Sequence, residues 1–389
     1  MKANPWAEGV PASGIREIVD KVAGRTDVAH LEMGQPDFPT PPHIIEAAVD
    51  SVRAGSGYTH SAGVPALREA LAAHLVSEGL PATPGQVIVT QGGVQGCSLL
   101  LSSLVQPGDE VLLPDPAWPN FAMLTALHGA TIVPYVLRRA SGYQPDLAEI
   151  ESLITPRTRL LVVNTPANPT GSVFTPEAVE GLVELSQRHG IVMLADEVYD
   201  GLIFDGEPAR AARLAPDHVV GLYSFSKTYA MTGWRVGYLL APAWLAPTLA
   251  KVQEPLLSCI PTMTQAGALA AITGPQACVT EMLGAYRRRR DLIVDTLRGG
   301  GLEVDRPAGA FYLILPLAAE ADSRLAALEL VDHGVAVSPG TAYGSAETQY
   351  LRLSLASSDE DCRDGSQRLV EWYHATEGGR HLVGSATSR

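Results

Sequence analysis

Short apolar runs alternate with longer amphipathic segments through the middle of the chain. The spacing leaves room for helices of about 10 to 15 residues between runs that are apolar throughout. The runs are "QVIVT", "DEVLLP", "TIVPYVL", "RLLVVN", "GIVMLADE", "VVGLYSF" and "RVGYLLA". Continuous apolar strands are typical of a parallel sheet that is buried on both faces. The pattern therefore predicts an α/β fold with a mostly parallel, seven-stranded sheet covered by helices.

The pattern also divides the chain into parts. Residues 1–44 are rich in Pro and Gly and predict an N-terminal arm that joins a smaller domain. The strand–helix alternation predicts a large domain over residues 45–278. A long helix and shorter, alternating strands predict a small α+β domain over residues 279–375. We expect the polar segment 376–389 to be a flexible tail.

Composition and charge narrow the class of protein. A formal net charge of −14 over 389 residues argues against binding of nucleic acid. The one basic run, "AYRRRRDL", is better explained as a salt-bridged helix face. The apolar runs are far shorter than the roughly 18 residues of a membrane span, and the N-terminus lacks a signal-peptide core. Four scattered cysteines without a CxxC pair indicate free thiols and no metal site. We expect a cytoplasmic protein.

Polar groups follow several of the predicted strands. "QGGVQG" comes after the first run, Asn168 lies in "TPANPTG", Asp196 and Tyr199 end "GIVMLADEVY", and Lys227 ends "SFSK". Ligands of open α/β sheets bind beyond the carboxyl ends of the strands, so we expect these groups to lie together. The glycine pair would let the backbone approach an anion at a helix N-terminus.

Each of these features has a purely structural explanation. The glycine pair and "NPTG" can be simple turns, Asp196 can cap a helix, and Arg235 can pair with an acid. Together, however, a phosphate cradle, an arginine, an amide, a carboxylate, a phenol and a lysine match the needs of pyridoxal phosphate. A lysine amine can bond to its aldehyde, and a carboxylate can keep its ring nitrogen protonated.

The same motifs resemble those of the class I/II pyridoxal phosphate-dependent aminotransferases of fold type I, in particular the bacterial aspartate-aminotransferase-like gamma subgroup. The resemblance runs in order through "LEMGQPDFPTP", "NPTG", "DEVY", "SFSKTYAMTGWRVGY", "AYRRRRDL", "RPAGAFY" and "YLRLSLA". It implies a homodimeric transaminase that moves an amino group between an L-amino acid and a 2-oxo acid by a ping-pong mechanism.

The resemblance also implies roles for residues that contact the cofactor. Lys227 would form the Schiff base and shuttle the proton, Asp196 would face the ring nitrogen, and Asn168 and Tyr199 would contact the ring 3-hydroxyl. Trp118 would stack on the ring and border the substrate, as would Asn168. The residues implied for the phosphate are Ser224, Ser226, Arg235 and the backbone of Gly93 and Val94.

Further roles implied by the resemblance concern the substrate and a second subunit. Arg352 would clamp the substrate α-carboxylate with help from the Gly34 backbone. Alternation in "YLRLS" is equally compatible with a surface position for Arg352. Tyr58 would reach the phosphate of the neighbouring subunit. The N-terminal arm, with Ile15, is expected to line the substrate side and close over it.

One position departs from the pattern of the aspartate-preferring relatives, which commonly carry a lysine after the glycine pair. Val94 stands there instead. The missing cation would cost roughly 1 to 3 kcal/mol of selectivity for a second carboxylate. We therefore expect a neutral amino donor to be favoured over aspartate.

Two alternative functions remain open at the level of sequence. A lyase, racemase or cyclising enzyme of the same fold would use the same lysine, aspartate and arginine. A regulator could bind pyridoxal phosphate without turnover, although Lys227 and Arg352 are both present. A nicotinamide dehydrogenase is disfavoured, because "QGGVQG" does not fit GxGxxG.

Overall fold

The computed structural model describes residues 4–207, 209–378 and 380, and its largest element is a seven-stranded sheet. The strand order is β2-β8-β7-β6-β5-β3-β4, and β8 runs antiparallel to β2 and β7. The strands are β2 (Val87–Thr90), β3 (Glu110–Asp115), β4 (Thr131–Val136), β5 (Thr158–Asn164), β6 (Val192–Asp196), β7 (Val219–Ser224) and β8 (Gly237–Leu240). The mostly parallel α/β sheet predicted from the apolar runs is thus confirmed.

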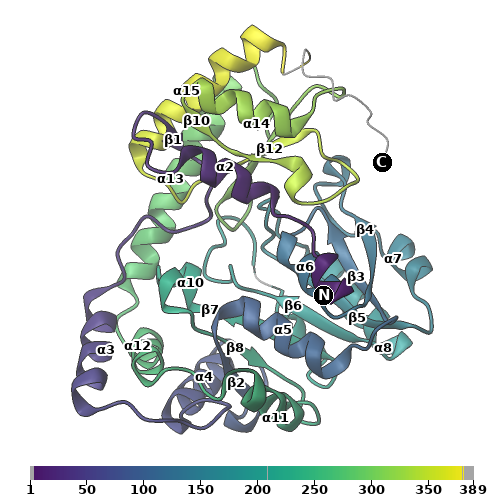
Figure 1. Cartoon of the computed structure of the whole chain (residues 1–389), viewed down its shortest axis with the longest axis vertical. Helices are drawn as coiled ribbons and strands as arrows, with labels where there is room; N and C mark the ends of the chain where they lie inside the picture. Colours follow the sequence, from purple (N-terminus) through teal and green to yellow (C-terminus); the bar gives the residue numbers. More distant parts are fainter. Residues whose placement is uncertain (1–3, 208, 379, 381–389) are drawn as a thin grey trace.

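Helices cover both faces of this sheet (Figure 1). Successive side chains of a strand point to opposite faces, so Val87 and Val89 enter one core and Ile88 enters another. The first core includes residues of α4 (Pro65–Ser77), α8 (Pro176–His189) and α12 (Thr262–Thr273). The second includes residues of α5 (Gly92–Leu104), α6 (Pro119–Leu127) and α11 (Ala246–Leu257). The edge strand β4 is largely uncovered, and its Ile132 is 38% exposed.

The C-terminal part of the chain forms a separate group of elements (Figure 1). Strand β12 (Tyr350–Ser354) pairs antiparallel with β9 (Tyr312–Pro316) and β11 (Ser338–Pro339). The predicted run "VAVSPG" is divided between two sheets, because β10 (Val335–Ala336) pairs instead with β1 (Ala29–His30). Two further helices pack here, α14 (Ser323–Asp332) and α15 (Asp359–Thr376).

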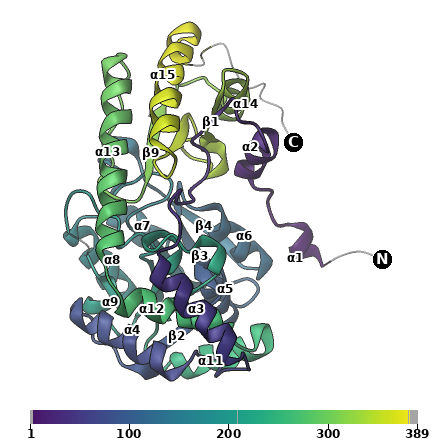
Figure 2. The same ribbon diagram turned by 90° about the vertical axis from the view of Figure 1, so that its left-hand side faces the viewer.

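The N-terminal segment joins this C-terminal group. Helix α2 (Gly14–Val22) lies beside α14 and β11, whereas the short α1 (Pro5–Glu8) lies against α6 (Figure 1). The long helix α13 (Ala277–Gly299) runs from the large-sheet region up into the C-terminal group (Figure 2). The domain boundaries that we place at residues 44/45 and 278/279 remain predictions. Of the expected tail, residues 379 and 381–389 lie outside the described residues.

The basic run on α13 forms ion pairs. Arg289 donates two hydrogen bonds of 2.8 Å to the carboxylate of Asp37 and one of 2.6 Å to Asp359. Arg290 pairs with Asp205 at 2.5 Å. Both arginine side chains are buried, so they serve as structural links between distant segments. Within the described residues, no helix is long and apolar enough to cross a membrane.

Candidate active site

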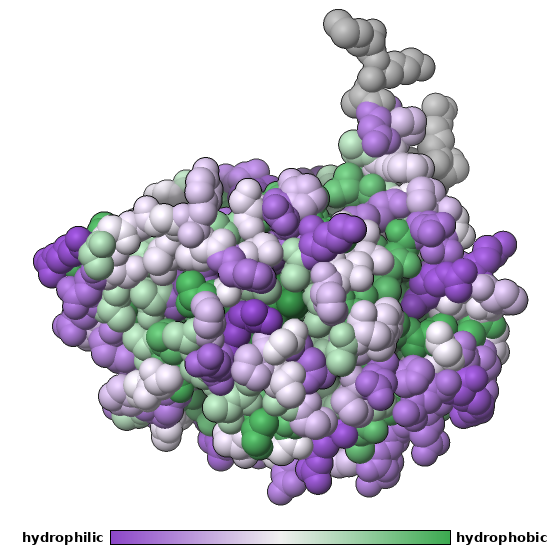
Figure 3. Space-filling model, turned by 90° about the horizontal axis from the view of Figure 1, so that it is seen from below, coloured by the Kyte–Doolittle hydropathy of each residue, from purple (hydrophilic) through white to green (hydrophobic). Residues whose placement is uncertain are grey.

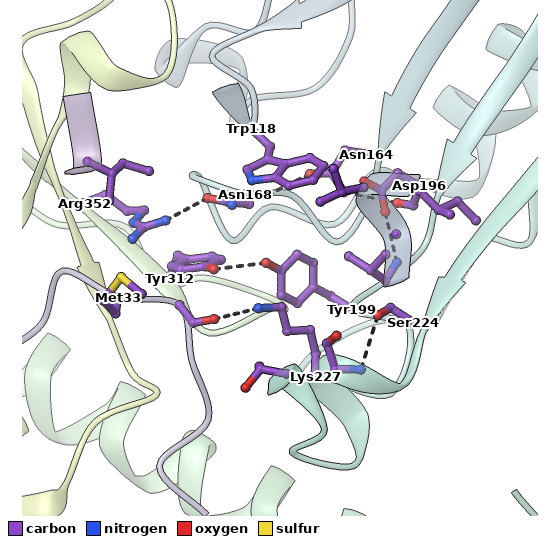
Figure 4. Close-up of a pocket in the computed structure, with 18 of the residues that line it drawn as sticks. Met33, Trp118, Asn164, Asn168, Asp196, Tyr199, Ser224, Lys227, Tyr312 and Arg352 are labelled. Carbon is purple, nitrogen blue, oxygen red and sulfur yellow. Dashed lines mark hydrogen bonds between the residues drawn. The ribbon is translucent and has the colours of Figure 1, made fainter. Parts of the chain in front are cut away.

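A cavity of about 240 Å³ opens at the carboxyl ends of three neighbouring strands (Figure 4). Asn164, Asp196 and Ser224 are the last residues of β5, β6 and β7, and all three line it. Other parts of its wall come from loops and helices of the large-sheet region, from the N-terminal segment, and from β9 and β12 of the C-terminal group. The cavity therefore lies where both parts of the chain meet, at the edge where ligands of open α/β sheets bind.

The structure brings together the candidate residues found by sequence, with one exception. Those that line the cavity are Gly34, Gly93, Val94, Trp118, Asn168, Asp196, Tyr199, Ser224, Ser226, Lys227, Arg235 and Arg352. Ile15 of the N-terminal arm lines it as well. Tyr58 does not, because it lies in the segment between α3 (Pro42–Ala54) and α4 and is 95% exposed.

Lys227 lies in the short helix α10 (Phe225–Thr228), which begins directly after β7. The Ser224 side chain caps this helix by accepting from the backbone N–H of Ser226 at 3.2 Å. The Nζ of Lys227 donates to the carbonyl oxygen of Gly34 at 2.6 Å. Burial, together with the positive charges of Arg352 and Arg235, lowers the pKa of Lys227 to about 8. A substantial neutral fraction makes this amine a competent nucleophile near neutral pH.

Asp196 is buried at the end of the central strand β6. Burial raises its pKa to about 7, against the effect of the backbone N–H of Val198, which donates to Oδ1 at 3.2 Å. A cation beside this carboxyl group would stabilise its charged form. The protonated ring nitrogen of pyridoxal phosphate is such a cation, so the position suits it.

Asn164, which sequence reasoning missed, holds two of the predicted residues in place. Its Nδ2 donates to the backbone carbonyl of Asp196 at 3.1 Å, and its Oδ1 accepts from the backbone N–H of Asn168 at 2.9 Å. Asn164 and Asp196 are also paired in the register of β5 and β6. The only signal in the sequence is the final residue of the run "RLLVVN".

Arg352 is 2% exposed and faces the cavity, whereas its neighbours Leu351 and Leu353 face the core. Its Nη1 donates to Oδ1 of Asn168 at 3.1 Å, and its Nη2 donates to the carbonyl of Glu32. Within the described part of the chain, its Nε has no hydrogen-bond partner. A buried guanidinium with spare donors, at the wall of a cavity, is suited to bind a carboxylate.

The residues predicted for the phosphate form a cradle beside Lys227. Helix α5 begins at Gly92, so its free backbone N–H groups face the cavity at Gly93 and Val94. Gly92 has φ +74°, and a Cβ there would lie 2.4 Å from Nη2 of Arg235. The hydroxyl-bearing Ser224 also lines this end. A helix N-terminus, a guanidinium and a hydroxyl are the donors that a phosphate group requires.

Tyr312 is a second residue that sequence reasoning did not assign. Its hydroxyl lies 3.0 Å from that of Tyr199, and the guanidinium carbon of Arg352 lies 4.2 Å from its ring centroid (Figure 4). The motif "RPAGAFY" contains it but gave no role for it. Other lining residues without a prior assignment are Glu32, Met33, Val198, Leu222 and Thr232.

Comparisons with known proteins agree with this geometry. The family "Aminotransferase class I and II" matches residues 26–369. The chain is 38% identical over 350 residues to the aspartate/prephenate aminotransferase of Thermus thermophilus, covering 88% of this chain and 90% of the relative. It is 38% identical over 360 residues to the LL-diaminopimelate aminotransferase of Desulforudis audaxviator, covering 90% and 92%.

Solved structures agree as well. The structure of the Thermus thermophilus aspartate aminotransferase with maleate is similar at 36% identity with a TM-score of 0.92, covering 95% of this chain and 99% of that one. The aromatic aminotransferase of Pyrococcus horikoshii is similar at 32% identity with a TM-score of 0.87, covering 93% and 99%. All four of these similar proteins are named aminotransferases, which favours a transaminase over the lyase, racemase and regulator alternatives. The chain therefore belongs to the class I and II aminotransferases, fold type I transaminases that use pyridoxal phosphate.

Proposed function

We propose that this transaminase takes a neutral L-amino acid as amino donor and works by a ping-pong mechanism with a 2-oxo acid. The observation that carries the proposal is the set of cations at the cavity. Among the described lining residues, the cations are Lys227, Arg235 and Arg352. The cofactor link, the phosphate and the α-carboxylate would use all three. None is left to pair with a second carboxylate, and Val94 occupies the place of the lysine expected in aspartate-preferring relatives.

The apolar part of the cavity wall supports the same proposal. Apolar side chains of Ile15, Met33, Val94, Val198 and Leu222 line the cavity. A carboxylate placed among such side chains without a paired cation would lose hydration and gain little in return. An aliphatic or aromatic side chain would instead replace water at these surfaces.

The residues at the centre of the cavity have complementary tasks in this proposal. When bound, pyridoxal phosphate supplies an electron-accepting ring that stabilises the charge left at Cα when its proton departs. Asp196 would hold the proton on the ring nitrogen, and Asn168 and Tyr199 would donate to the ring 3-hydroxyl oxygen. Lys227 would hold the cofactor covalently in the resting enzyme, and its freed amine would carry the proton taken from Cα.

Arg352 orients the substrate in this proposal. Its guanidinium, fixed by Asn168 and Glu32, would bind the α-carboxylate in a bidentate pair. The Cα–H bond would then be held toward Lys227, across the plane of the ring. Both half-reactions pass through the same groups, so donor and acceptor would bind in turn. Trp118 would cover the ring from the opposite wall.

We further propose that the enzyme is a cytoplasmic homodimer in which Tyr58 completes the phosphate site of the partner. Its nearly full exposure leaves the phenol available to another molecule. The neighbouring helix α3 also exposes apolar side chains, since Ile45, Val49 and Val52 are 40 to 53% exposed. Apolar residues lie among hydrophilic ones on the face of the molecule seen from below (Figure 3). The three exposed apolar side chains of α3, close to Tyr58 in the chain, favour a subunit interface at this helix.

The direct test of donor class is a half-reaction. Cofactor-loaded protein is mixed with single amino acids without a 2-oxo acid, while its visible absorbance and the released 2-oxo acid are measured. We expect one equivalent of 2-oxo acid, formed at least tenfold faster from leucine or phenylalanine than from aspartate. Faster release from aspartate would contradict the neutral-donor proposal and would leave the family membership intact. Sedimentation of wild-type protein tests the dimer, and a weaker affinity of Tyr58→Phe for pyridoxal phosphate tests the Tyr58 contact.

A further inference from the structure

The hydroxyl of Tyr312 lies where three groups of the cavity meet. It is 3.0 Å from the hydroxyl of Tyr199, and the guanidinium of Arg352 lies over the Tyr312 ring (Figure 4). A Cβ added at Gly34 would lie 1.8 Å from this oxygen, so the Gly34 backbone is in direct contact with it. Tyr199 and Tyr312 are both buried, at 3% and 2% exposure. Tyr312 is thus held on three sides.

These neighbours belong to opposite ends of the proposed reaction. Arg352 and Gly34 would hold the substrate α-carboxylate, whereas Tyr199 would donate to the 3-hydroxyl oxygen of the cofactor. Tyr312 contacts both ends. We propose that Tyr312 is a positioning residue that signals occupancy of the carboxylate site to the cofactor through the hydroxyl of Tyr199. This inference rests on the proposed function, which assigns the two ends.

Proton counting shows how such a signal arises. Two tyrosine hydroxyls carry two protons, but they border three gaps: carboxylate to Tyr312, Tyr312 to Tyr199, and Tyr199 to the cofactor oxygen. Burial raises the pKa of both phenols, so both protons are present at neutral pH. Without substrate, Tyr312 donates to Tyr199, which donates to the cofactor. A donor that itself accepts a hydrogen bond is the stronger donor.

A bound carboxylate changes this arrangement. It lies against Arg352 and offers Tyr312 an acceptor of higher negative charge than the Tyr199 oxygen. The proton of Tyr312 then leaves the gap between the phenols, and Tyr199 donates more weakly to the cofactor oxygen. Less stabilisation of negative charge on that oxygen raises the proton affinity of the lysine–cofactor bond. Carboxylate binding would therefore favour a proton on the lysine–cofactor bond. The ammonium group of the amino donor must lose a proton before it can react, and it could supply this one.

Other charges around this pair act on the cofactor too. Asp196, Arg352 and Arg235 are the charged groups whose fields reach Tyr199 or Lys227. A bound carboxylate cancels part of the Arg352 field whether or not Tyr312 has a hydroxyl. The contribution of Tyr312 is therefore the difference in titration midpoint between wild-type protein and Tyr312→Phe, measured with and without a carboxylate.

The test is a pH titration of the visible absorbance of cofactor-loaded protein, with and without 4-methylpentanoate, a carboxylate that has no amino group to react. We expect Tyr312→Phe to raise the ligand-free midpoint by about 0.3 to 1 pH unit, a two- to tenfold change in proton affinity. With carboxylate bound, the two midpoints should coincide. Equal ligand-free midpoints in wild type and Tyr312→Phe would overturn the proposal.

Two further variants keep the outcome decisive. Tyr286→Phe removes another buried hydroxyl that has no partner within the described residues, and its midpoint should match wild type. Tyr199→Phe combined with Tyr312→Phe should shift no further than Tyr199→Phe alone, because Tyr312 acts through Tyr199. Additive shifts would overturn the relay. Absence of any titrating band in wild type, or its persistence in Lys227→Ala, would instead contradict the proposed site.

Discussion

The Nζ of Lys227 donates a hydrogen bond to the carbonyl oxygen of Gly34, which precedes it by 193 residues. Gly34 belongs to segment 32–38, whose other contacts also reach distant parts of the chain. The carbonyl of Glu32 accepts from Arg352, and Asp37 is held by Arg289 of α13. One short segment therefore fixes the positions of both cations that would face the substrate.

Replacing Lys227 tests the central assignment. In Lys227→Ala, we expect the loss of covalently bound cofactor and a fall of at least a thousandfold in the half-reaction, because the amine is both the attachment point and the proton carrier. Absorbance after removal of free cofactor and stopped-flow rates provide the measurements. The exposed Lys251 of α11 offers the control, since Lys251→Ala should behave as wild type. Retained covalent cofactor in Lys227→Ala would show that another lysine binds it.

The lowered pKa of Lys227 has a consequence for cofactor loading. A neutral amine attacks the aldehyde, and its fraction rises tenfold per pH unit below the pKa and levels off above it. With a pKa of about 8, we expect the loading rate of cofactor-free protein to rise from pH 6 to 8 and then level off. A rate that continues to rise tenfold per unit to pH 10 would show an ordinary lysine. Rapid mixing with pyridoxal phosphate across this pH range gives the profile.

The Val94 position can be tested by restoring a cation. Val94→Lys should raise kcat/KM for aspartate relative to leucine by about tenfold or more, since a cation facing a second carboxylate contributes roughly 1 to 3 kcal/mol. Val94→Met is the control of similar length without charge. An unchanged ratio in Val94→Lys would show that the side chain at this position does not face the distal group of the substrate.

The ion pair between Arg289 and Asp37 gives a prediction for stability. Arg289→Gln leaves the partly exposed carboxylates of Asp37 and Asp359 without their partner, and we expect a loss of about 1 to 3 kcal/mol in the free energy of unfolding. Because Asp37 anchors segment 32–38, KM for the amino donor should rise as well. The exposed Arg288 on the same helix is the matched control. Equal urea denaturation midpoints for Arg289→Gln and Arg288→Gln would contradict the expectation.

Much of the fold was predictable because the buried strands are apolar along their whole length. Exposing the apolar side chains of "QVIVT" and "VVGLYSF" to water would cost much free energy, and both runs form strands of the central sheet. The division of "VAVSPG" between β10 and β11 was not predictable, since it depends on pairing with residues 29–30 from the other end of the chain. Local pattern contains no information about such partners.

The same distinction applies to the site. Residues that follow strands could be grouped by the rule that ligands bind at carboxyl ends, and the cavity contains all of them. The role of Asn164 could not be predicted, because its hydrogen bonds follow from its register with Asp196 on the next strand. Alternation left the direction of Arg352 open, because its strand has the core on one side and the cavity on the other. The contact proposed for Tyr58 requires a second chain and stays a prediction.

The cavity wall draws on residues from Ile15 to Arg352, nearly the full span of the chain. During synthesis on the ribosome, a chain that has reached Lys227 still lacks β9, β12 and the guanidinium of Arg352, which complete the cavity wall. Stable capture of the cofactor must therefore wait until the last strand has emerged and paired. In a cell, only completed molecules would then hold the cofactor. A prematurely terminated chain would keep an unmodified Lys227, and its exposed apolar cavity wall would be accessible to proteases.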